Sequence, residues 1–239
     1  MKASFVKLLA LTTLICGTAA QKIVLANDDG WATANIREEY KELVAAGFEV
    51  ILSAPPVDRS GTGRSTATPT PMNVTCEFDT CAVGSPAIGT DPHDRNIHYV
   101  HAFPADAVRV GIQDLAKARW GKNPDFVVAG VNIGRNLGPT VHISGTDSAA
   151  CEAANLGIPS FAFSGQSDNF KFIATKSFPD TPGGDTERCG SRQLPLEQTV
   201  SDAGCFATVS VINSTTEDNA LAAEQKAVFD RAHSLLTCM

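Results

Sequence analysis

The sequence has little of what marks several protein classes. Aromatic residues make up only 7% of the 239 positions, and the 19 Gly and 13 Pro residues follow no repeat. This composition excludes a coiled coil, a collagen and a solenoid. No cluster of Lys or Arg stands out, and the formal charge is −7. We therefore expect no nucleic-acid duplex as partner, because affinity for a duplex comes mainly from basic contacts to phosphate.

Several familiar catalytic and metal-binding motifs are also missing. The chain contains no GxSxG, HExxH or GxxxxGK[ST] sequence, which argues against the usual serine hydrolases, zincins and P-loop NTPases. It has no CxxC pair either, so disulfides are a better explanation than zinc for the six cysteines that follow residue 20. Up to three disulfides are expected, and Cys76 with Cys81 is the local pairing we predict.

Long apolar segments are absent after residue 20, so no membrane span is expected. Residues 1–20 combine Lys2 and Lys7 with a short apolar run and a small-residue end, which is typical of a cleavable signal peptide; a membrane anchor is the alternative. Two sequons for N-glycosylation fit the secretory route: Asn73-Val74-Thr75 and Asn213-Ser214-Thr215. We expect a secreted, extracellular glycoprotein.

What the chain does contain is an alternation of apolar runs and helical patterns. Strands are predicted at residues 22–26, 48–54, 126–131 and 158–163. Helices are predicted from Asn35, with Glu38 as capping partner and Gly47 as terminator, from Pro104, over about 147–156, and over 217–236. This order predicts an α/β fold with a Rossmann-like three-layer core and a mostly parallel sheet. Residues 21–239 are expected to form a single domain, with 57–98 and 165–206 as long loops or small hairpins pinned by disulfides rather than separate domains.

Polar clusters follow several of these strands, and they suggest a metal site. Asp28 and Asp29 come directly after a buried strand, where two adjacent carboxylates are costly unless a cation neutralises them. With the Ser60 hydroxyl and the Asn132 carbonyl they would form a hard oxygen shell for Mg²⁺ or Mn²⁺, with Ca²⁺ as a further candidate. For each of these residues, a capped turn or an ordinary loop is the alternative.

A second cluster, Ser144-Gly145-Thr146, opens a predicted helix and could bind an anion through backbone amides. Plain N-capping is the alternative. His142 could act as an acid toward a leaving group, although a lone His is more often structural. Phosphate-binding roles are assigned to six residues: Asn27, Gly61, Asn136, Ser144, Gly145 and Thr146.

In their order and spacing these motifs resemble the SurE family of survival-protein nucleotidases and phosphatases. The resemblance runs from Ile23 to about Gly165 and rests on seven segments: 23–30, Ala54-Pro55, 60–63, Pro104-Ala105-Asp106, 130–136, 144–146 and Gly157-Ile158-Pro159. Among its members the chain looks similar to the secreted fungal acid phosphatases. It departs from the family pattern at Asp147-Ser148, and the family's C-terminal arm is not recognisable beyond about residue 165.

The resemblance implies a divalent-metal-dependent phosphomonoester hydrolase, of the acid phosphatase or 5′(3′)-nucleotidase type. It implies metal ligation by Asp28, Asp29, Ser60 and Asn132, and small-molecule phosphomonoesters or nucleoside monophosphates as substrates. Asp28 and Asp29 are the expected catalytic residues, by activating water or by direct attack on phosphorus. A homodimer is compatible with the family. A catalytically inactive secreted binding module with the same fold is the alternative.

Overall fold

The computed structural model describes residues 20–165, 171–204 and 206–238. The predicted signal peptide lies outside these ranges except for its last residue, so the structure does not test it. None of the helices in the described ranges has the length and apolar character needed to cross a bilayer.

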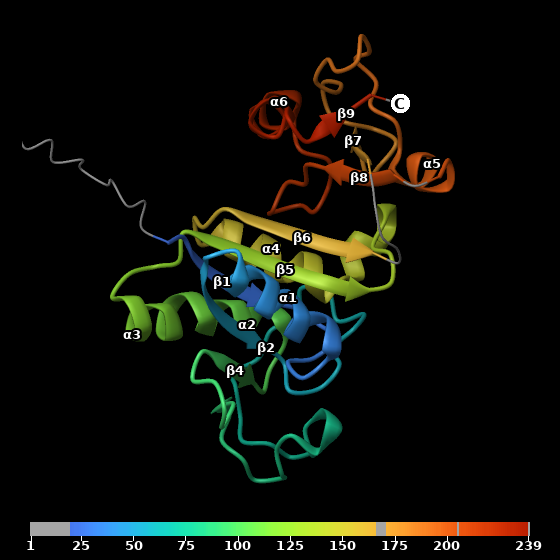
Figure 1. Ribbon diagram of the computed structural model, residues 1–239. Helices are drawn as coiled ribbons and strands as arrows, with labels where there is room; N and C mark the ends of the chain where they lie inside the picture. Colours follow the sequence, from blue (N-terminus) through green and yellow to red (C-terminus); the bar gives the residue numbers. More distant parts are fainter. Residues whose placement is uncertain (1–19, 166–170, 205, 239) are drawn as a thin grey trace, which may run out of the picture.

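A six-stranded, mostly parallel sheet forms the centre of the molecule, in the order β3-β4-β2-β1-β5-β6 (Figure 1). All neighbouring strands are parallel except β3 and β4. The strands are β1 (Lys22–Ala26), β2 (Glu49–Ala54), β3 (Ile88–Thr90), β4 (Ile97–Val100), β5 (Phe126–Ile133) and β6 (Ser160–Gly165). The four strands predicted from the sequence are present, and the predicted α/β class is confirmed.

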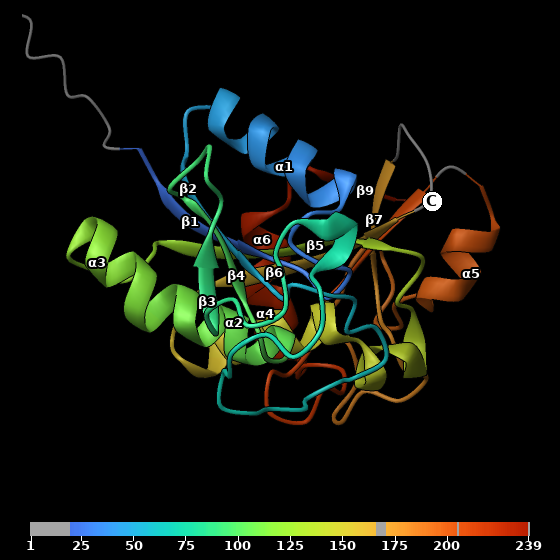
Figure 2. The same ribbon diagram turned by 90° about the horizontal axis from the view of Figure 1, so that it is seen from below.

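Helices cover both faces of this sheet. One face carries α1 (Ala34–Ala45), and the other carries α2 (Pro104–Val110), α3 (Ala116–Trp120) and α4 (Gly145–Asn155) (Figure 2). A π-helical turn, Gly111–Leu115, joins α2 to α3. The three layers are those expected of a Rossmann-like core.

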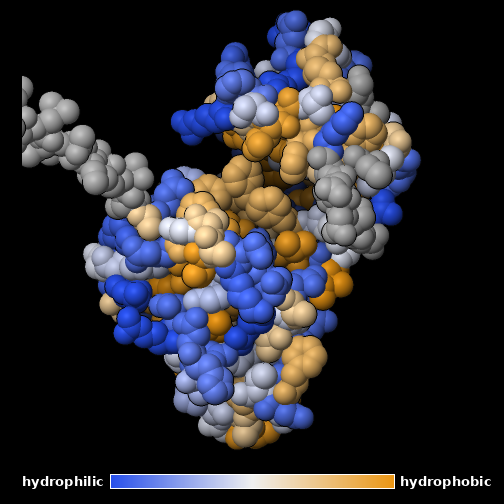
Figure 3. Space-filling view, viewed as in Figure 1, coloured by the Kyte–Doolittle hydropathy of each residue, from blue (hydrophilic) through white to orange (hydrophobic). Residues whose placement is uncertain are grey.

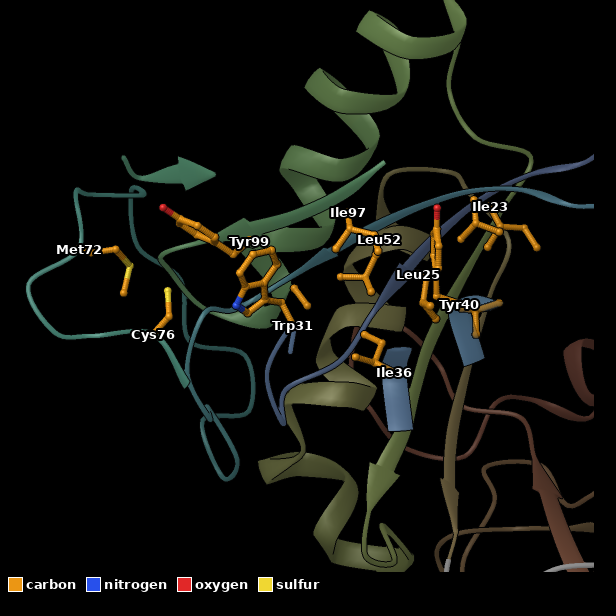
Figure 4. Packing of buried hydrophobic residues seen from close by; sticks show 13 residues of the cluster. Ile23, Leu25, Trp31, Ile36, Tyr40, Leu52, Met72, Cys76, Ile97 and Tyr99 are labelled. Atoms are coloured by element: carbon orange, nitrogen blue, oxygen red, sulfur yellow. The ribbon is translucent and has the colours of Figure 1, made fainter. Parts of the chain in front are cut away.

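The alternation of side chains along β1 explains these layers. Ile23 and Leu25 pack with Ile36 of α1, whereas Val24 packs with Val108 of α2 on the opposite face. Figure 4 shows the first cluster, which continues through the aromatic rings of this face toward Met72 and Cys76. Each fully buried branched side chain contributes roughly 2 kcal/mol to stability. The packed sheet therefore holds the carboxyl ends of its strands in fixed positions.

The start of α1 differs from prediction, whereas its end agrees. The N-cap of α1 is Thr33, and Asn35 lies inside the helix, so the predicted Asn35 and Glu38 capping pair is wrong. Thr33 already has extended backbone geometry, and its Oγ1 donates to the Gly30 carbonyl. Gly47, with φ of +92°, ends the helix as predicted.

The chain beyond residue 170 forms a small unit that we call the C-terminal lobe, residues 171–238. It holds a second, parallel sheet in the order β8-β7-β9, made of β7 (Lys171–Thr175), β8 (Phe206–Ser210) and β9 (Leu236–Thr237). Its helices are α5 (Glu197–Asp202) and α6 (Ala222–Arg231). The prediction of long loops over 165–206 was therefore wrong in part, and the predicted helix over 217–236 is shorter, ending where the chain turns into β9.

The C-terminal lobe sits beyond β6, the edge strand of the large sheet (Figure 1). Phe161 and Phe163 of β6 are each 44% exposed, and Phe172 of β7 is 38% exposed. Figure 3 shows hydrophobic surface in the hollow between the large sheet and this lobe.

Two disulfides join described cysteines. Cys76 pairs with Cys81, as predicted. Cys189 pairs with Cys238, which links the residue after β9 to the segment between β7 and β8. Cys151 is buried and pairs with no cysteine that the structure describes, and Cys205 lies outside the described residues. The long segment that links β2 to β3, residues 55–87, contains a 3₁₀ turn, Glu77–Asp79.

Candidate functional site

The candidate site lies where β1 and β5 end. β1 pairs with β2 on one side and with β5 on the other, so the chain reverses its direction of winding between β1 and β5. In open α/β sheets this switch point, at the carboxyl ends of the strands, is where ligands bind. Asp28 and Asp29 follow β1 directly, and Asn132 lies near the end of β5. The two stretches are thus side by side, as the sequence predicted.

Asp28 is buried and held by the start of α4. Its Oδ2 accepts a hydrogen bond of 3.0 Å from the Gly145 amide, and its Oδ1 accepts one from the Thr146 hydroxyl. A Cβ at position 145 would lie 2.7 Å from the Cβ of Asp28, so glycine is required for this approach. The dipole and free amide at the start of a helix stabilise a carboxylate here.

Asp29 and Asn132 complete the core of the site. The Ile133 amide donates to Asp29 Oδ2 at 2.9 Å, which joins the loop after β1 to the end of β5. Asn132 donates from Nδ2 to the Gly134 carbonyl, which turns its Oδ1 to within 3.5 Å of the Thr146 Oγ1. Thr146 therefore bridges the carboxylate of Asp28 and the amide oxygen of Asn132.

Burial, together with the charges of Asp28 and Asp58, raises the pKa of Asp29 to about 6, although the hydrogen bond from the Ile133 amide acts to lower it. Among the residues that the structure describes, no Lys, Arg or His forms an ion pair with Asp28 or Asp29. Two buried carboxylates without a cationic partner are an unstable arrangement.

The predicted donor set fits a hard divalent cation. Two carboxylates and an amide oxygen lie in segments that hydrogen bonds link at this edge of the sheet, and such oxygens are the ligands that Mg²⁺, Mn²⁺ and Ca²⁺ prefer. Within the described ranges no group of three or more His, Cys, Asp and Glu side chains could hold a metal ion. The candidate shell thus depends on neutral oxygens in addition to the two carboxylates.

Ser60 lies next to this group without bonding to it. The Arg59 amide donates to the Asp28 carbonyl at 2.7 Å, which brings the loop after β2 beside the loop after β1. The Ser60 amide donates to Asp58 Oδ1, and its hydroxyl bonds to no residue that the structure describes. Gly61 follows with φ of +73° and is exposed, with open space at the position of a Cβ.

The donors predicted to bind phosphate are partly used by the protein itself. The Ser144 hydroxyl accepts from the Asp147 amide at 3.0 Å and from Asn136 Nδ2 at 2.6 Å, so Ser144 caps α4 and orients Asn136. Gly145 and Thr146 bind Asp28, as described above. The structure therefore joins four predicted residues by hydrogen bonds around Asp28, namely Asp28, Asn132, Gly145 and Thr146, and pairs Ser144 with Asn136 beside them at the start of α4.

Asn27 has a structural role in the same loop. Its Oδ1 accepts from the Gly30 amide and its Nδ2 donates to the Gly30 carbonyl, which closes the turn that carries Asp28 and Asp29. Gly30 has φ of +114°, and a Cβ there would meet Glu77 Oε2 at 2.0 Å.

Glu77 is a residue that sequence analysis missed. Its Oε1 accepts from the Asp58 amide, and its pKa is raised by burial and by the charges of Asp58 and Asp29. Its position next to Cys76 of the disulfide is the one signal that could have drawn attention to it.

Two further groups border the site. His142 stacks on Phe178 with ring centroids 5.0 Å apart, and its Nδ1 lies 3.8 Å from Glu217 Oε2. Burial raises the pKa of Asp147 to about 7, with contributions from the charges of Glu197, Glu217 and Asp28. Asp147, which departs from the family pattern, is therefore neutral well below pH 7 and charged well above it.

A cavity of about 440 Å³ opens beside the loop after β2. This volume is in the range of small-molecule pockets. Arg59 and His101 supply its charged and titratable groups; the His101 Nδ1 lies 2.8 Å from the Thr70 carbonyl. The other lining residues are small or moderately apolar: Val57, Ala67, Thr68, Thr70, Asn73 and Val74.

Comparison with known proteins agrees with this architecture. The model of the family described as survival protein SurE matches residues 23–214. The chain belongs to the SurE family. An acid phosphatase of Yarrowia lipolytica is 42% identical over 149 residues, 60% of this chain and 41% of that protein. The 5′-nucleotidase SurE of Lawsonia intracellularis is 36% identical over 142 residues, 59% of this chain and 50% of that protein.

A solved structure, that of the Sure protein from Aquifex aeolicus, is 30% identical and covers 62% of this chain and 53% of its own, with a TM-score of 0.47. The chain spans about half the length of the curated SurE relatives that it matches. The SurE model nonetheless extends into the C-terminal lobe, well past residue 165, where the resemblance seen in the sequence ended.

Proposed function

We propose that the chain is a divalent-metal-dependent phosphomonoester hydrolase of the acid phosphatase or nucleotidase type. The observation that carries the proposal is the pair of buried carboxylates at the switch point between β1 and β5, with the Asn132 oxygen beside them and no ion-pairing residue among the described ones. The names of the two relatives, acid phosphatase and 5′-nucleotidase SurE, support the same reaction class.

Asp28, Asp29 and Asn132 would hold the cation, with the Ser60 hydroxyl completing the set from the neighbouring loop. When bound, a divalent cation neutralises charge on phosphate oxygens and lowers the pKa of water. Asp28 is oriented for this role by Gly145 and Thr146, and Asp29 by the Ile133 amide. Asn136, fixed by its bond to Ser144, and the exposed amide at Gly61 would contact the phosphate.

The organic part of the substrate would occupy the cavity lined by Arg59 and His101, because it opens directly beside the Ser60 loop. Its size suits a leaving group such as a nucleoside. We also propose that residues 1–20 direct secretion, which the two disulfides support, since disulfides form in oxidising compartments.

Asp29→Asn is the sharpest test of the proposed site. Within the described part of the chain Asp29 accepts one hydrogen bond, from Ile133, so the substitution disturbs the fold less than Asp28→Asn, which would set an amide against two donors. Release of phosphate from p-nitrophenyl phosphate and from nucleoside monophosphates would be measured with Mg²⁺, Mn²⁺ and Ca²⁺, and after chelation. We expect a loss of at least about a hundredfold in the variant, in line with removal of a group that acts on the transition state.

The matched control is Asp114→Asn, which removes one exposed carboxylate from the π-helical turn. It should leave turnover unchanged. Full activity of Asp29→Asn, or of the chelated wild type, would rule out the proposed metal-dependent reaction. A catalytically inactive binding module is the second candidate, favoured by the carboxylate of Asp147 next to the start of α4; it requires that the wild type release no phosphate with any of the ions.

A further inference from the structure

Glu217 is a buried acid of the C-terminal lobe that reaches toward the candidate site. It lies in the turn between β8 and α6, and only 3% of the residue is exposed. Its Oε1 is 3.5 Å from Arg64 Nε, and its Oε2 is 3.8 Å from His142 Nδ1. Oε1 makes no hydrogen bond with any residue that the structure describes, so the Arg64 guanidinium is the cation that compensates this buried carboxylate, with the His142 ring beside it.

Both partners of Glu217 belong to segments that carry candidate site residues. Arg64 comes four positions after Ser60, and His142 comes two positions before Ser144. These two segments also touch directly, because the Gly63 amide donates to the Ile143 carbonyl at 3.0 Å. Glu217 thus covers the point where the loop after β2 meets the approach to α4.

The contact between these segments is close. A Cβ on Gly63 would lie 2.8 Å from the His142 carbonyl oxygen, and Gly63 itself has φ of +49°. On its far side, His142 stacks against Phe178 of the lobe. A small displacement of either segment would therefore move the other.

Hydrogen bonds fix the turn that carries Glu217 and so hold its carboxylate in place. Glu217 has φ of +59°, a left-handed conformation that is unfavourable for a residue with a side chain. Asn213 holds the turn: its carbonyl accepts from the Glu217 amide at 2.8 Å, and its Oδ1 accepts from the amides of Thr215 and Thr216. Arg64 adds a hydrogen bond from Nη1 to the Thr215 carbonyl.

The surroundings of Glu217 are electrostatically mixed. Burial raises its pKa, and Arg64 and His142 lower it. Asp147 is close enough for its charge to interact with that of Glu217. Arg64 and His142 are therefore the two groups that favour the charged carboxylate.

We propose that Glu217 is a positioning residue of the C-terminal lobe. It holds Arg64 and His142 together and thereby fixes the loop after β2 against the segment that leads into α4. The inference depends on the proposed phosphatase function and assigns a part in it to a lobe that carries none of the candidate ligands. Glu217 acts through its two partners and contacts neither the substrate nor the cation site.

The test compares Glu217→Gln with Asp218→Asn in the full chain. Asp218 is the next residue, is exposed, and its side chain forms no hydrogen bond or ion pair with any residue that the structure describes. Steady-state hydrolysis of p-nitrophenyl phosphate with Mg²⁺ gives kcat and KM. We expect kcat/KM to fall by roughly tenfold to a hundredfold in Glu217→Gln, as on loss of a residue that orients a site, with most of the change in KM.

A second readout separates positioning from a general loss of structure. Mg²⁺ binding to the protein without substrate, measured by calorimetry, should be unchanged in Glu217→Gln, because Asp28 and Asp29 are untouched. Arg64→Gln removes the same contact from a side chain that is 46% exposed, so it keeps the fold, and it should raise KM by a similar factor. Arg64→Lys retains a cation and should restore most of the activity. Because the two residues form one pair, the double variant should be no worse than either single variant.

The outcomes are distinct. If the wild type is active and both Glu217→Gln and Arg64→Gln match Asp218→Asn, the positioning role is wrong while the phosphatase function stands. If Glu217→Gln loses Mg²⁺ binding together with activity and Arg64→Gln does not, the residue supports only the fold, and the inference fails. A wild type without activity overturns the proposed function and this inference with it.

Discussion

Replacing Asp147 by Asn should stabilise the protein in alkaline buffer and change little in acid. Burial, with the charges of Glu197, Glu217 and Asp28, raises the pKa of Asp147 from 3.8 to about 7. An acid whose pKa is raised by folding holds its proton more tightly in the folded state. Below pH 3.8 Asp147 is protonated in both the folded and the unfolded state, so it does not change the free energy of unfolding. As the pH rises from 3.8 toward 7, the free energy of unfolding falls. At about 1.4 kcal/mol for each pH unit, the cost above pH 7 is roughly 4 kcal/mol.

The Asp147→Asn variant removes this cost because its amide is neutral at every pH. Urea unfolding followed by circular dichroism would be compared for variant and wild type at pH 4 and at pH 8. A chelator must be present, since a cation bound near Asp28 would itself favour the charged form of Asp147. We expect a gain of roughly 3 to 5 kcal/mol at pH 8 and less than about 1 kcal/mol at pH 4.

Asp114→Asn serves as the control, since it removes an equal charge at an exposed position. It should shift neither curve. The reasoning would be refuted by a variant that is no more stable than the wild type at pH 8, or by a gain of the same size at both pH values, because neither result can come from a titrating carboxylate.

Three further predictions concern activity and the lobe. Asp147→Asn should extend phosphatase activity to higher pH, because above about pH 7 the wild-type carboxylate repels phosphate near the start of α4; a superimposable pH profile would contradict this. Gly145→Ala should abolish activity and lower the melting temperature, since its Cβ would lie 2.7 Å from the Asp28 Cβ, and unchanged turnover would be evidence against the described geometry. Replacing Cys189 and Cys238 by Ser opens a loop of 49 residues, which should destabilise the C-terminal lobe by about 4 kcal/mol in chemical denaturation, whereas an unaltered unfolding curve would show that the pair contributes nothing.

Much of the central sheet could be predicted from the sequence, because its strands are short buried runs separated by helical patterns. The site carboxylates could be placed as well: Asp28 and Asp29 follow one strand and Asn132 lies near the end of another, and parallel strands bring such ends to one edge. The resemblance to the SurE family, seen in the sequence up to about residue 165, is confirmed by the family model, which matches residues 23–214.

The partners of those carboxylates could not be predicted. That Gly145 and Thr146 donate to Asp28 depends on how closely α4 approaches the loop after β1, and this is a matter of tertiary packing. Both residues looked like free donors for phosphate, because a helix start exposes amides by default. Glu77 was missed for the same reason, since its contacts come from a disulfide-closed loop without periodic pattern.

The C-terminal lobe was the least predictable part. Its strands have only two to five residues, too few for a period of hydrophobic residues to mark them, and the segment between β7 and β8 is rich in Gly, Pro and Ser. Their pairing joins residue 172 to residue 236, a distance in sequence at which local patterns carry no information. The contact of Glu217 with Arg64 is likewise formed only in the folded chain.

The tight approach of Gly145 to Asp28 also limits how this scaffold can evolve. Neither position tolerates a larger side chain, because the room between them is already filled by Pro104 and by the two residues themselves. New substrate preferences must therefore arise at the rim. The exposed stretch around Ala67 and Thr70 borders the adjoining cavity without supporting the sheet. Libraries aimed at altered selectivity should concentrate diversity there and leave the centre untouched.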